Sequence, residues 1–402
     1  MSLSPSQLDN IPNSMVALYQ GLEDYIIKDF ARRVNKTGTI TSTAEWMAIR
    51  AEEIGIATKN INKEIEKLVT IAIDELDILF KDSALASMNS DNKIFEAGRL
   101  DRIKIEEHPA LKEYLNAAIA QTKGELINIT RSLGFAEIVN GKIVYKDIAK
   151  MYHNQLDLAQ MKVSTGVSDY NSAIRQAVKK ITDSGLRYID YENGWSNRVD
   201  VAVRRSVLTS VNQMSQKMTE YNISELGLEL VEVSAHAGAR PNHAEWHGQI
   251  YSYKGNHEKY PDLVEATGYG TGEGLGGYNC RHSFFPYLDG TARTYTDKYL
   301  QSLNDKTVEY EDKQYTDYEA SQYQRKLERS MRQTKRELIA YKEAGLDKDF
   351  TNASIKLQQQ KRKYEDFSKA ARIRQKNDRT QVQGFDRSIA QKSVWASKRG
   401  DN

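Results

Sequence analysis

Apolar side chains recur every three or four residues over most of this chain, and this spacing constrains the fold more than any other feature. Near the N-terminus the series Val16, Tyr19, Leu22, Ile26 and Phe30 follows this spacing, which continues to about residue 83 and resumes near residue 111. Such spacing aligns apolar side chains in one stripe along an α-helix. Only six prolines occur in 402 residues, so few positions interrupt helices. We therefore expect a mainly α protein with long amphipathic helices.

The pattern changes at about Gly227 and returns to helical spacing from about Tyr295. In between, the segments LELVEVSAH, GQIYSYKG and RHSFFPYL are rich in β-favouring residues and predict three short strands. The intervening ARPNHAEWHG predicts a short helix, with Pro241 near its start and Gly248 past its end. The expected organisation is a helical region at 1–226, a compact α+β core with a Gly/His-rich motif at 227–290, and a charged helical region at 291–402.

Three further expectations concern the helical regions. A long helix is expected over residues 199–226, through VDVAVRRSVLTSVNQMSQKM. A short turn at residues 140–142 separates two expected helices, the second of which begins at Ile143. The last 20 residues are rich in Gln, Arg and Ser and are expected to be frayed or to depend on a partner.

Charge is distributed unevenly along the chain. Residues 321–402 contain 21 Lys and Arg against 10 Asp and Glu, whereas the other 320 residues contain 36 against 45. A basic C-terminal region suggests an anionic partner, such as nucleic acid or an acidic protein surface. A solvated helical face of mixed charge accounts for the same composition, and the sequence leaves both interpretations open.

The sequence also bounds the compartment. It contains no run of about 18 apolar residues, so we expect no membrane span. Its first residues lack the basic and then apolar pattern of a secretory signal. A single cysteine excludes an internal disulfide framework. These features favour a cytoplasm, or a particle assembled there.

Five of the seven histidines and the only cysteine lie within residues 236–282, namely His236, His243, His247, His257, His282 and Cys280. Imidazole nitrogen and thiolate sulfur are typical zinc ligands. His243 and His247 are four residues apart on the expected helix and would share a face. Cys280 and His282 are two residues apart on an expected strand and would also share a face. These four residues could together bind one metal ion, such as zinc.

Other interpretations of this window remain open. HAEWH is not the H-E-x-x-H of zinc proteases, because Glu245 lies between the histidines and off their common face. One cysteine in C-x-H does not match a zinc-finger spacing either. The histidines could form structural hydrogen bonds, bind metal, or take part in catalysis, and we favour these uses in that order. No catalytic residue is assigned.

The glycine run from Gly268 to Gly277 contains no G-x-x-x-x-G-K-[ST], which excludes a Walker-type phosphate loop. Its glycines are expected to allow positive φ and close approach of the backbone. Trp246 is expected in the core. Arg240 and Arg281 flank the cluster and could bind phosphate or carboxylate, although structural ion pairs are favoured for both.

Three segments of the chain read VDVAVRRSVLTSVNQ, LVEVSAHAGARPNHAEWHGQIYS and YPDLVEATGYGTGEGLGGYNCRHSFFPYLDG. They resemble the phage minor capsid protein 2 family, which belongs with the Mu F-like and SPP1-type head-morphogenesis proteins. The helical flanks are also similar, so the resemblance covers nearly the whole chain. Two stretches match the family motif, with residues His236, Gly238, Ala239, Arg240 and Pro241 in the first and Asn279, Cys280, Arg281 and His282 in the second. In the wider group the second stretch often reads Cys-Arg-Cys, so His282 replaces a cysteine with another ligand-type residue.

The resemblance implies a low-copy structural protein of the virion, assembled in the host cytoplasm and associated with the portal or the inner capsid. It implies a role in head assembly, DNA packaging or ejection, with portal and capsid proteins as partners and several copies in each virion. The basic C-terminal region could contact DNA through its phosphates. The resemblance implies no demonstrated enzymatic activity. The alternative is a metal-dependent hydrolase or nuclease with His243, His247, Cys280 and His282 around the metal, and we favour the structural protein.

Overall fold

The computed structural model describes residues 3–37, 43–140, 142–165, 167, 169–190, 194–255, 257–303 and 308–400. The helices are α1 (Pro5–Asn10), α2 (Asn13–Thr37), α3 (Thr43–Ala97), α4 (Pro109–Arg131), α5 (Ile148–Ser164), α6 (Tyr170–Ser184), α7 (Val199–Glu225), α8 (Pro241–Ala244), α9 (Leu263–Thr267), α10 (Asp297–Ser302), α11 (Asp317–Glu343), α12 (Asp347–Ala370) and α13 (Arg387–Gly400), with short 3-10 helices at Ile105–Glu107 and Asn377–Thr380. The strands are β1 (Leu133–Val139), β2 (Lys142–Asp147), β3 (Arg187–Ile189), β4 (Ser196–Arg198), β5 (Leu230–Val233), β6 (Ile250–Ser252), β7 (Phe284–Tyr287), β8 (Val308–Tyr310) and β9 (Lys313–Tyr315).

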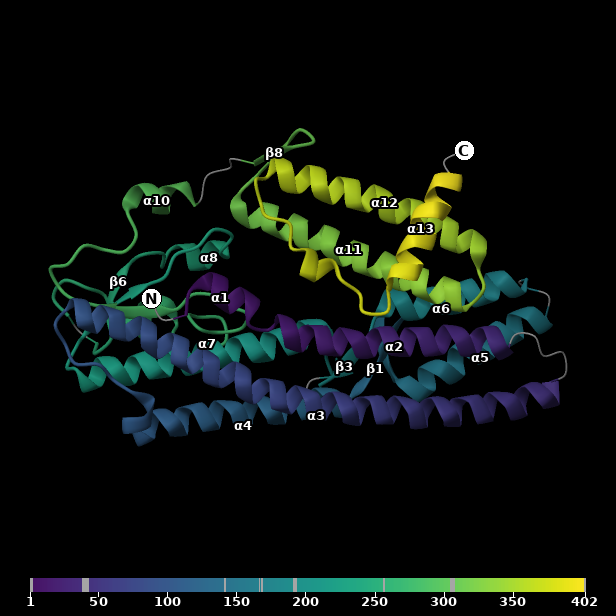
Figure 1. Cartoon of the computed structure of the whole chain (residues 1–402), viewed down its shortest axis with the longest axis horizontal. Coiled ribbons are helices and arrows are strands. Elements are labelled where there is room, and N and C mark those ends of the chain that lie inside the picture. The colour runs from purple at the N-terminus through teal and green to yellow at the C-terminus, as the bar shows by residue number, and fades with distance from the viewer. Residues whose placement is uncertain are drawn as a thin grey trace. The chain divides into compact units, whose positions relative to one another are not determined.

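Long helices dominate the structure, as the apolar spacing predicts (Figure 1). α3 alone has 55 residues, and α7 spans 27 residues close to the bounds expected from its sequence. The expected mainly α fold with a small α+β unit is therefore confirmed. Among the described residues, no helix combines the length and apolar character that a membrane crossing requires.

The chain forms two compact units, each assembled from segments distant in sequence. Unit 1 comprises Met1–Val16, Ile71–Ile127 and Val203–Ser321, and unit 2 comprises Ala17–Thr70, Asn128–Ala202 and Gln322–Asn402. The region expected as the compact core, residues 227–290, lies wholly within unit 1.

Unit 1 contains a three-stranded antiparallel sheet of order β6-β5-β7. Its strands lie within the three segments predicted from the sequence, but β7 begins only at Phe284, so Cys280 and His282 precede the strand on which they were expected. β5 is central, and Val231 lies opposite Tyr251 on one side and Pro286 on the other. All four residues of β5 are buried, as a central strand covered on both faces requires.

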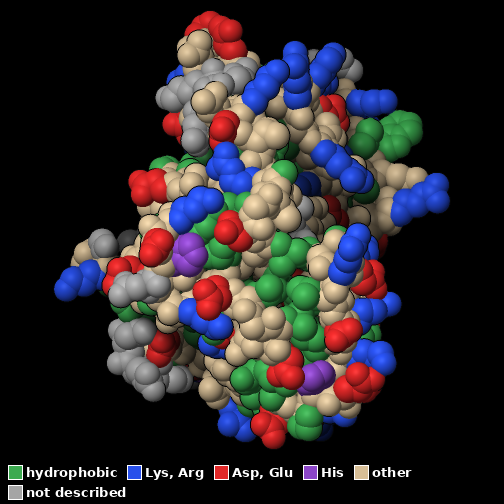
Figure 2. All heavy atoms as spheres, turned by 90° about the vertical axis from the view of Figure 1, so that its left-hand side faces the viewer, with side chains coloured by type: hydrophobic (Ala, Val, Ile, Leu, Met, Phe, Trp, Pro, Cys, Tyr) green, Lys and Arg blue, Asp and Glu red, His purple; other side chains and the backbone are tan. Residues whose placement is uncertain are grey.

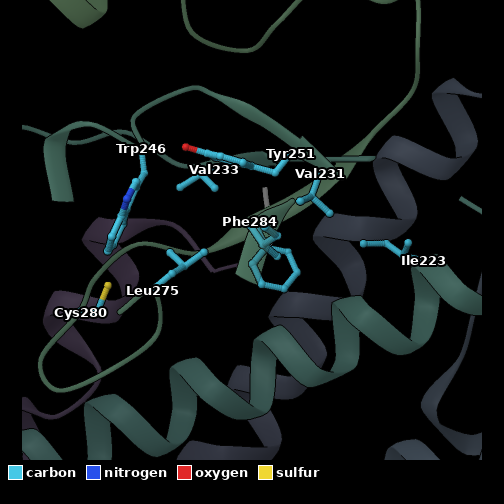
Figure 3. Close-up of a cluster of buried hydrophobic side chains, with 9 residues drawn as sticks. Ile223, Val231, Val233, Trp246, Tyr251, Leu275, Cys280 and Phe284 are labelled. Atoms are coloured by element: carbon cyan, nitrogen blue, oxygen red, sulfur yellow. The ribbon is translucent and has the colours of Figure 1, made fainter. Parts of the chain in front are cut away.

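A hydrophobic cluster packs against this sheet (Figure 3). Ile223 of α7 lies at one end, whereas Trp246 and Cys280 lie at the other, with side chains of β5 and β7 between them. Trp246 is 9% exposed, which confirms its expected place in the core. The N-terminal segment joins the same unit, because the Ser283 hydroxyl donates to the carbonyl of Leu3 (2.8 Å).

The expectation of helices alone across residues 1–226 is wrong for part of unit 2. β1, β2, β3 and β4 form a four-stranded sheet of order β2-β1-β3-β4, and the expected helix from Ile143 begins only at Ile148. β1 and β2 form a hairpin in which Val139 pairs with Lys142. Asn140 adopts a φ of 50°, which Asn tolerates better than most residues. Asn-Gly at residues 140–141 of the sequence is a strong hairpin signal, which outweighs the helical spacing that follows it.

The C-terminal region departs from expectation twice. A β8–β9 hairpin occupies residues expected to be helical, turning through Glu311 and Asp312, which both have positive φ. The last residues form α13, which contacts α12, rather than a frayed tail (Figure 1). Ile389 is buried on this helix, so an apolar contact holds a segment whose composition predicts none.

Candidate functional site

The histidine and cysteine residues of the family motif meet at one edge of the three-stranded sheet of unit 1. In an antiparallel sheet the end of the central strand lies beside the starts of both neighbours. His236 follows β5, His243 and His247 precede β6, and Cys280 and His282 precede β7. The β6-β5-β7 order therefore brings together residues that are up to 46 positions apart.

Three of these side chains converge closely. The Cys280 Sγ lies 3.6 Å from His243 Nδ1 and 3.5 Å from His282 Nδ1. One potential ligand atom from each of the three residues lies within 4.8 Å of the other two, and all three side chains are buried. We call His243, Cys280 and His282 the buried triad.

His247, the fourth predicted ligand, contacts a residue of the triad but does not belong to it. Its Nε2 is 2.8 Å from Nε2 of His282, the nitrogen that faces away from the Cys280 sulfur. The expected helix is shorter than predicted, because α8 ends at Ala244 and turns follow to Gly248. His247 therefore contacts Nε2 of His282, whereas His243 contacts the Cys280 sulfur on the Nδ1 side of that ring, so the two histidines do not line one helical face.

The remaining histidines of the window have different surroundings. The centroid of the His236 ring lies 4.5 Å from that of the His282 ring, with the two ring planes tilted by 33°. The His236 Nδ1 donates to the carbonyl of Ala237, and its buried Nε2 has no hydrogen-bond partner among the described residues. His257 lies outside the cluster, where its Nδ1 accepts from the backbone N–H groups of Lys259 and Tyr260.

Burial sets the protonation of the cluster. It lowers the pKa of His236 to about 3 and that of His247 to about 4, and it lowers the pKa of His282 well below its ordinary value. The pKa of His243 is also lowered, by burial and by the nearby Arg240. The imidazoles are therefore neutral near pH 7, the form that binds metals. Burial raises the pKa of the Cys280 thiol, so an unassisted thiolate nucleophile is disfavoured.

Arg240 and Arg281 connect the two motif stretches reciprocally. Arg240 Nη2 donates to the carbonyl of Tyr278 (2.6 Å), and Arg281 Nη2 donates to the carbonyl of Gly238 (3.0 Å). Arg281 thus satisfies a main-chain acceptor in the first stretch, and Arg240 satisfies one at the residue directly before the second stretch. An ion pair of Arg240 with Glu273 (3.5 Å) also forms, but the Glu273 side chain is 81% exposed, so this pair contributes little.

Two side chains of α7 form hydrogen bonds to the backbone of the triad, and neither was predicted from the sequence. Asn212 Nδ2 donates to the carbonyls of Cys280 (3.1 Å) and His282 (2.9 Å), and Gln216 Nε2 also donates to the carbonyl of His282 (3.2 Å). Both residues are buried. The available signal was the spacing of Asn212 and Gln216, which are four residues apart and so lie on one face of the helix.

The glycine-rich loop between α9 and Cys280 folds tightly on itself. A Cβ at Gly274 would lie 1.9 Å from the carbonyl oxygen of Gly268, and one at Gly276, whose φ is +75°, would lie 2.1 Å from Gln216 Oε1. Both the close approach and the positive φ expected of this run are therefore confirmed. The loop supplies the carbonyl of Glu273, which lies 3.0 Å from His243 Nε2.

Comparison with known proteins agrees with the motif. The phage minor capsid protein 2 family matches residues 3–369 of this chain. A protein of Lactococcus phage LL-H described as a structural protein is 22% identical over 363 residues, covering 88% of this chain and 90% of that protein. No solved structure matches the chain. Since the family match spans nearly the whole sequence, this chain belongs to the phage minor capsid protein 2 family and is a structural protein of a phage.

Proposed function

We propose that the protein is a low-copy component of the phage head, associated with the portal or the inner face of the capsid, where it supports head assembly and DNA packaging or ejection. The match of the minor capsid family to residues 3–369 carries this proposal. Its partners are portal and capsid proteins, several copies are present in each virion, and assembly takes place in the host cytoplasm.

Asymmetric reconstruction of intact particles tests this location. The 55-residue α3 offers a long feature that can be identified in density. Density for α3 beside the portal or under the shell would support the proposal. Density on the outer capsid surface, or absence of the protein from purified particles, would overturn it.

DNA contact through the basic C-terminal region is the second part of the proposal. Some of its charge is used inside unit 2, where Arg336 pairs with Glu23 (3.0 Å) and Asp24 (2.8 Å) and Arg332 pairs with Asp200 (3.4 Å). The exposed basic side chains that remain available for phosphates are Lys326, Arg329, Lys348, Arg362, Lys369, Arg372, Arg374, Arg387, Lys392, Lys398 and Arg399. On the face in Figure 2, Lys and Arg side chains lie among Asp and Glu side chains. A test therefore needs substitutions on one defined helix rather than a change in the overall charge of the protein.

α13 provides that helix, because one side is buried at Ile389 and its exposed positions carry four basic side chains, three of which (Lys392, Lys398 and Arg399) lie beyond the first turn. We expect the triple variant Lys392→Gln, Lys398→Gln and Arg399→Gln to bind duplex DNA more weakly. The slope of log affinity against log salt should lose about 0.9 for each phosphate contact removed. The matched control neutralises three exposed lysines of unit 1, Lys93, Lys112 and Lys298. Equal slopes for the wild type and the α13 variant would refute contact through this helix.

The enzyme alternative has a physical argument against it. The buried triad residues have exposed fractions of 1% for His243 and 2% each for Cys280 and His282, so a polymer substrate does not reach them without rearrangement of the fold. DNA cleavage by the purified protein on addition of divalent metal, lost in Cys280→Ser, would favour a nuclease instead.

A further inference from the structure

We propose that the buried triad binds a single zinc ion through His243 Nδ1, Cys280 Sγ and His282 Nδ1, and that this ion fastens the segment before β6 to the segment before β7. The proposal rests on distances within unit 1 and is independent of where the protein lies in the particle.

The sulfur–nitrogen distances match a tetrahedral zinc site. Zn–N bonds of about 2.05 Å and a Zn–S bond of about 2.3 Å at the tetrahedral angle place nitrogen and sulfur about 3.6 Å apart. The two observed distances from the Cys280 sulfur are 3.6 Å and 3.5 Å. The two imidazole ligand nitrogens lie within 4.8 Å of each other. The tetrahedral value is about 3.3 Å, so a small rotation of one ring brings both nitrogens to the ion.

The outer nitrogens of both imidazoles have the partners that metal-bound histidines require. A ligating histidine usually donates its other ring N–H to an acceptor, which fixes the tautomer and the ring orientation. His243 Nε2 lies 3.0 Å from the carbonyl of Glu273, and His282 Nε2 lies 2.8 Å from Nε2 of His247. With these two N–H donors in place, both Nδ1 lone pairs face the Cys280 sulfur. His247 is thus a positioning residue rather than a ligand.

The backbone around the triad is also held in advance. Asn212 fixes the carbonyls on both sides of Arg281, so Cys280 and His282 keep their relative orientation. Such fixed ligands lose little conformational freedom when the ion binds. The three ligands leave one coordination position for water.

A metal-free arrangement of the same atoms is the rival. In it the His247 Nε2–H donates to His282 Nε2, the His282 Nδ1–H donates to the Cys280 sulfur, and the thiol donates to His243 Nδ1. This chain also satisfies each of these groups, so a measurement of bound metal must decide between the two.

The first experiment uses the full chain, purified without a polyhistidine tag and without chelator. Elemental analysis should find one zinc per chain. Because Cys280 is the only cysteine, replacing the zinc with Co²⁺ should produce a thiolate-to-cobalt charge-transfer absorption that reports this residue without any substitution. No bound zinc together with no such absorption would overturn the proposal in favour of the hydrogen-bonded chain.

Variants then assign the ligands. Cys280→Ser and His282→Gln should lose the zinc, whereas His257→Gln, a histidine of the same unit outside the cluster, should retain it. His247→Gln should still bind zinc at saturation, with an affinity lower by about 10- to 100-fold, as expected for an outer partner. Zinc retained by both Cys280→Ser and His282→Gln would place the metal elsewhere and refute the triad. If a variant does not fold, the cobalt spectrum of the wild type still decides the question.

Discussion

Asp91 of α3 should make the stability of unit 1 depend on pH. Its carboxyl group is fully buried, and its Oδ2 accepts hydrogen bonds from the Thr219 hydroxyl (2.8 Å) and from Asn222 Nδ2 (3.1 Å). Its Oδ1 has no hydrogen-bond partner among the described residues. Burial raises the pKa of Asp91 from 3.8 to about 6, since the two hydrogen bonds offset only part of the lost hydration.

The direction follows from the raised pKa. Between about pH 4 and pH 6 the folded state holds a proton that the unfolded state has released, so stability falls as pH rises through this window and is constant above it. A shift of about 2 units corresponds to about 3 kcal/mol. In Asp91→Asn the amide oxygen keeps both donors and no charge is buried. The stability of the variant relative to the wild type should therefore increase by about 3 kcal/mol between pH 4 and pH 8.

Denaturant unfolding across this pH range measures the difference. Trp246 is the only tryptophan of unit 1, so its fluorescence follows this unit once the three tryptophans of unit 2 are replaced by Phe. Asp82→Asn, on an exposed position of the same helix, is the matched control. A difference between Asp91→Asn and the wild type that stays constant from pH 4 to pH 8 would refute the reasoning.

Two further substitutions test other contacts. Arg336→Met in unit 2 leaves the carboxylates of Glu23 and Asp24 buried without this partner and should lower the unfolding free energy by about 3–5 kcal/mol; a loss below 1 kcal/mol in urea unfolding would contradict an essential pairing role. Gly274→Ala places a Cβ 1.9 Å from the carbonyl oxygen of Gly268, so the loop must shift. Its melting temperature should fall below that of the wild type, and an unchanged value would show that the loop tolerates the shift.

The helices could be predicted from the sequence because their signal is local. The three- and four-residue spacing placed α7 within a residue at each end. The hairpin of β1 and β2 was missed because the apolar spacing after residue 142 fits a helix as well as a strand, and this spacing was weighed above the Asn-Gly turn signal at residues 140–141. α13 was missed for a different reason, since its order depends on packing against α12, which the composition of the segment does not reveal.

The residues of the candidate site could be predicted from the sequence, but their arrangement in space could not. The enrichment of His and Cys in residues 236–282 pointed to the cluster. Which nitrogen meets the sulfur depends on the antiparallel order β6-β5-β7, which the sequence does not specify. The support from Asn212 and Gln216 comes from a helix about 70 residues earlier, and only the folded chain places it under the cluster.

The geometry of the motif bears on where the protein meets its partners. Arg240 and Arg281 each donate to the main chain of the opposite stretch, and His243, Cys280 and His282 face one another in the interior. The side chains of the motif therefore contact one another and stabilise the fold of unit 1, whereas side chains that line a binding cleft would be accessible to solvent. Under the proposed function, the surfaces that contact portal or capsid proteins then lie outside the motif. Substitutions in the motif should accordingly reduce the stability of unit 1 before they change partner choice, and substitutions on exposed helical faces should do the reverse.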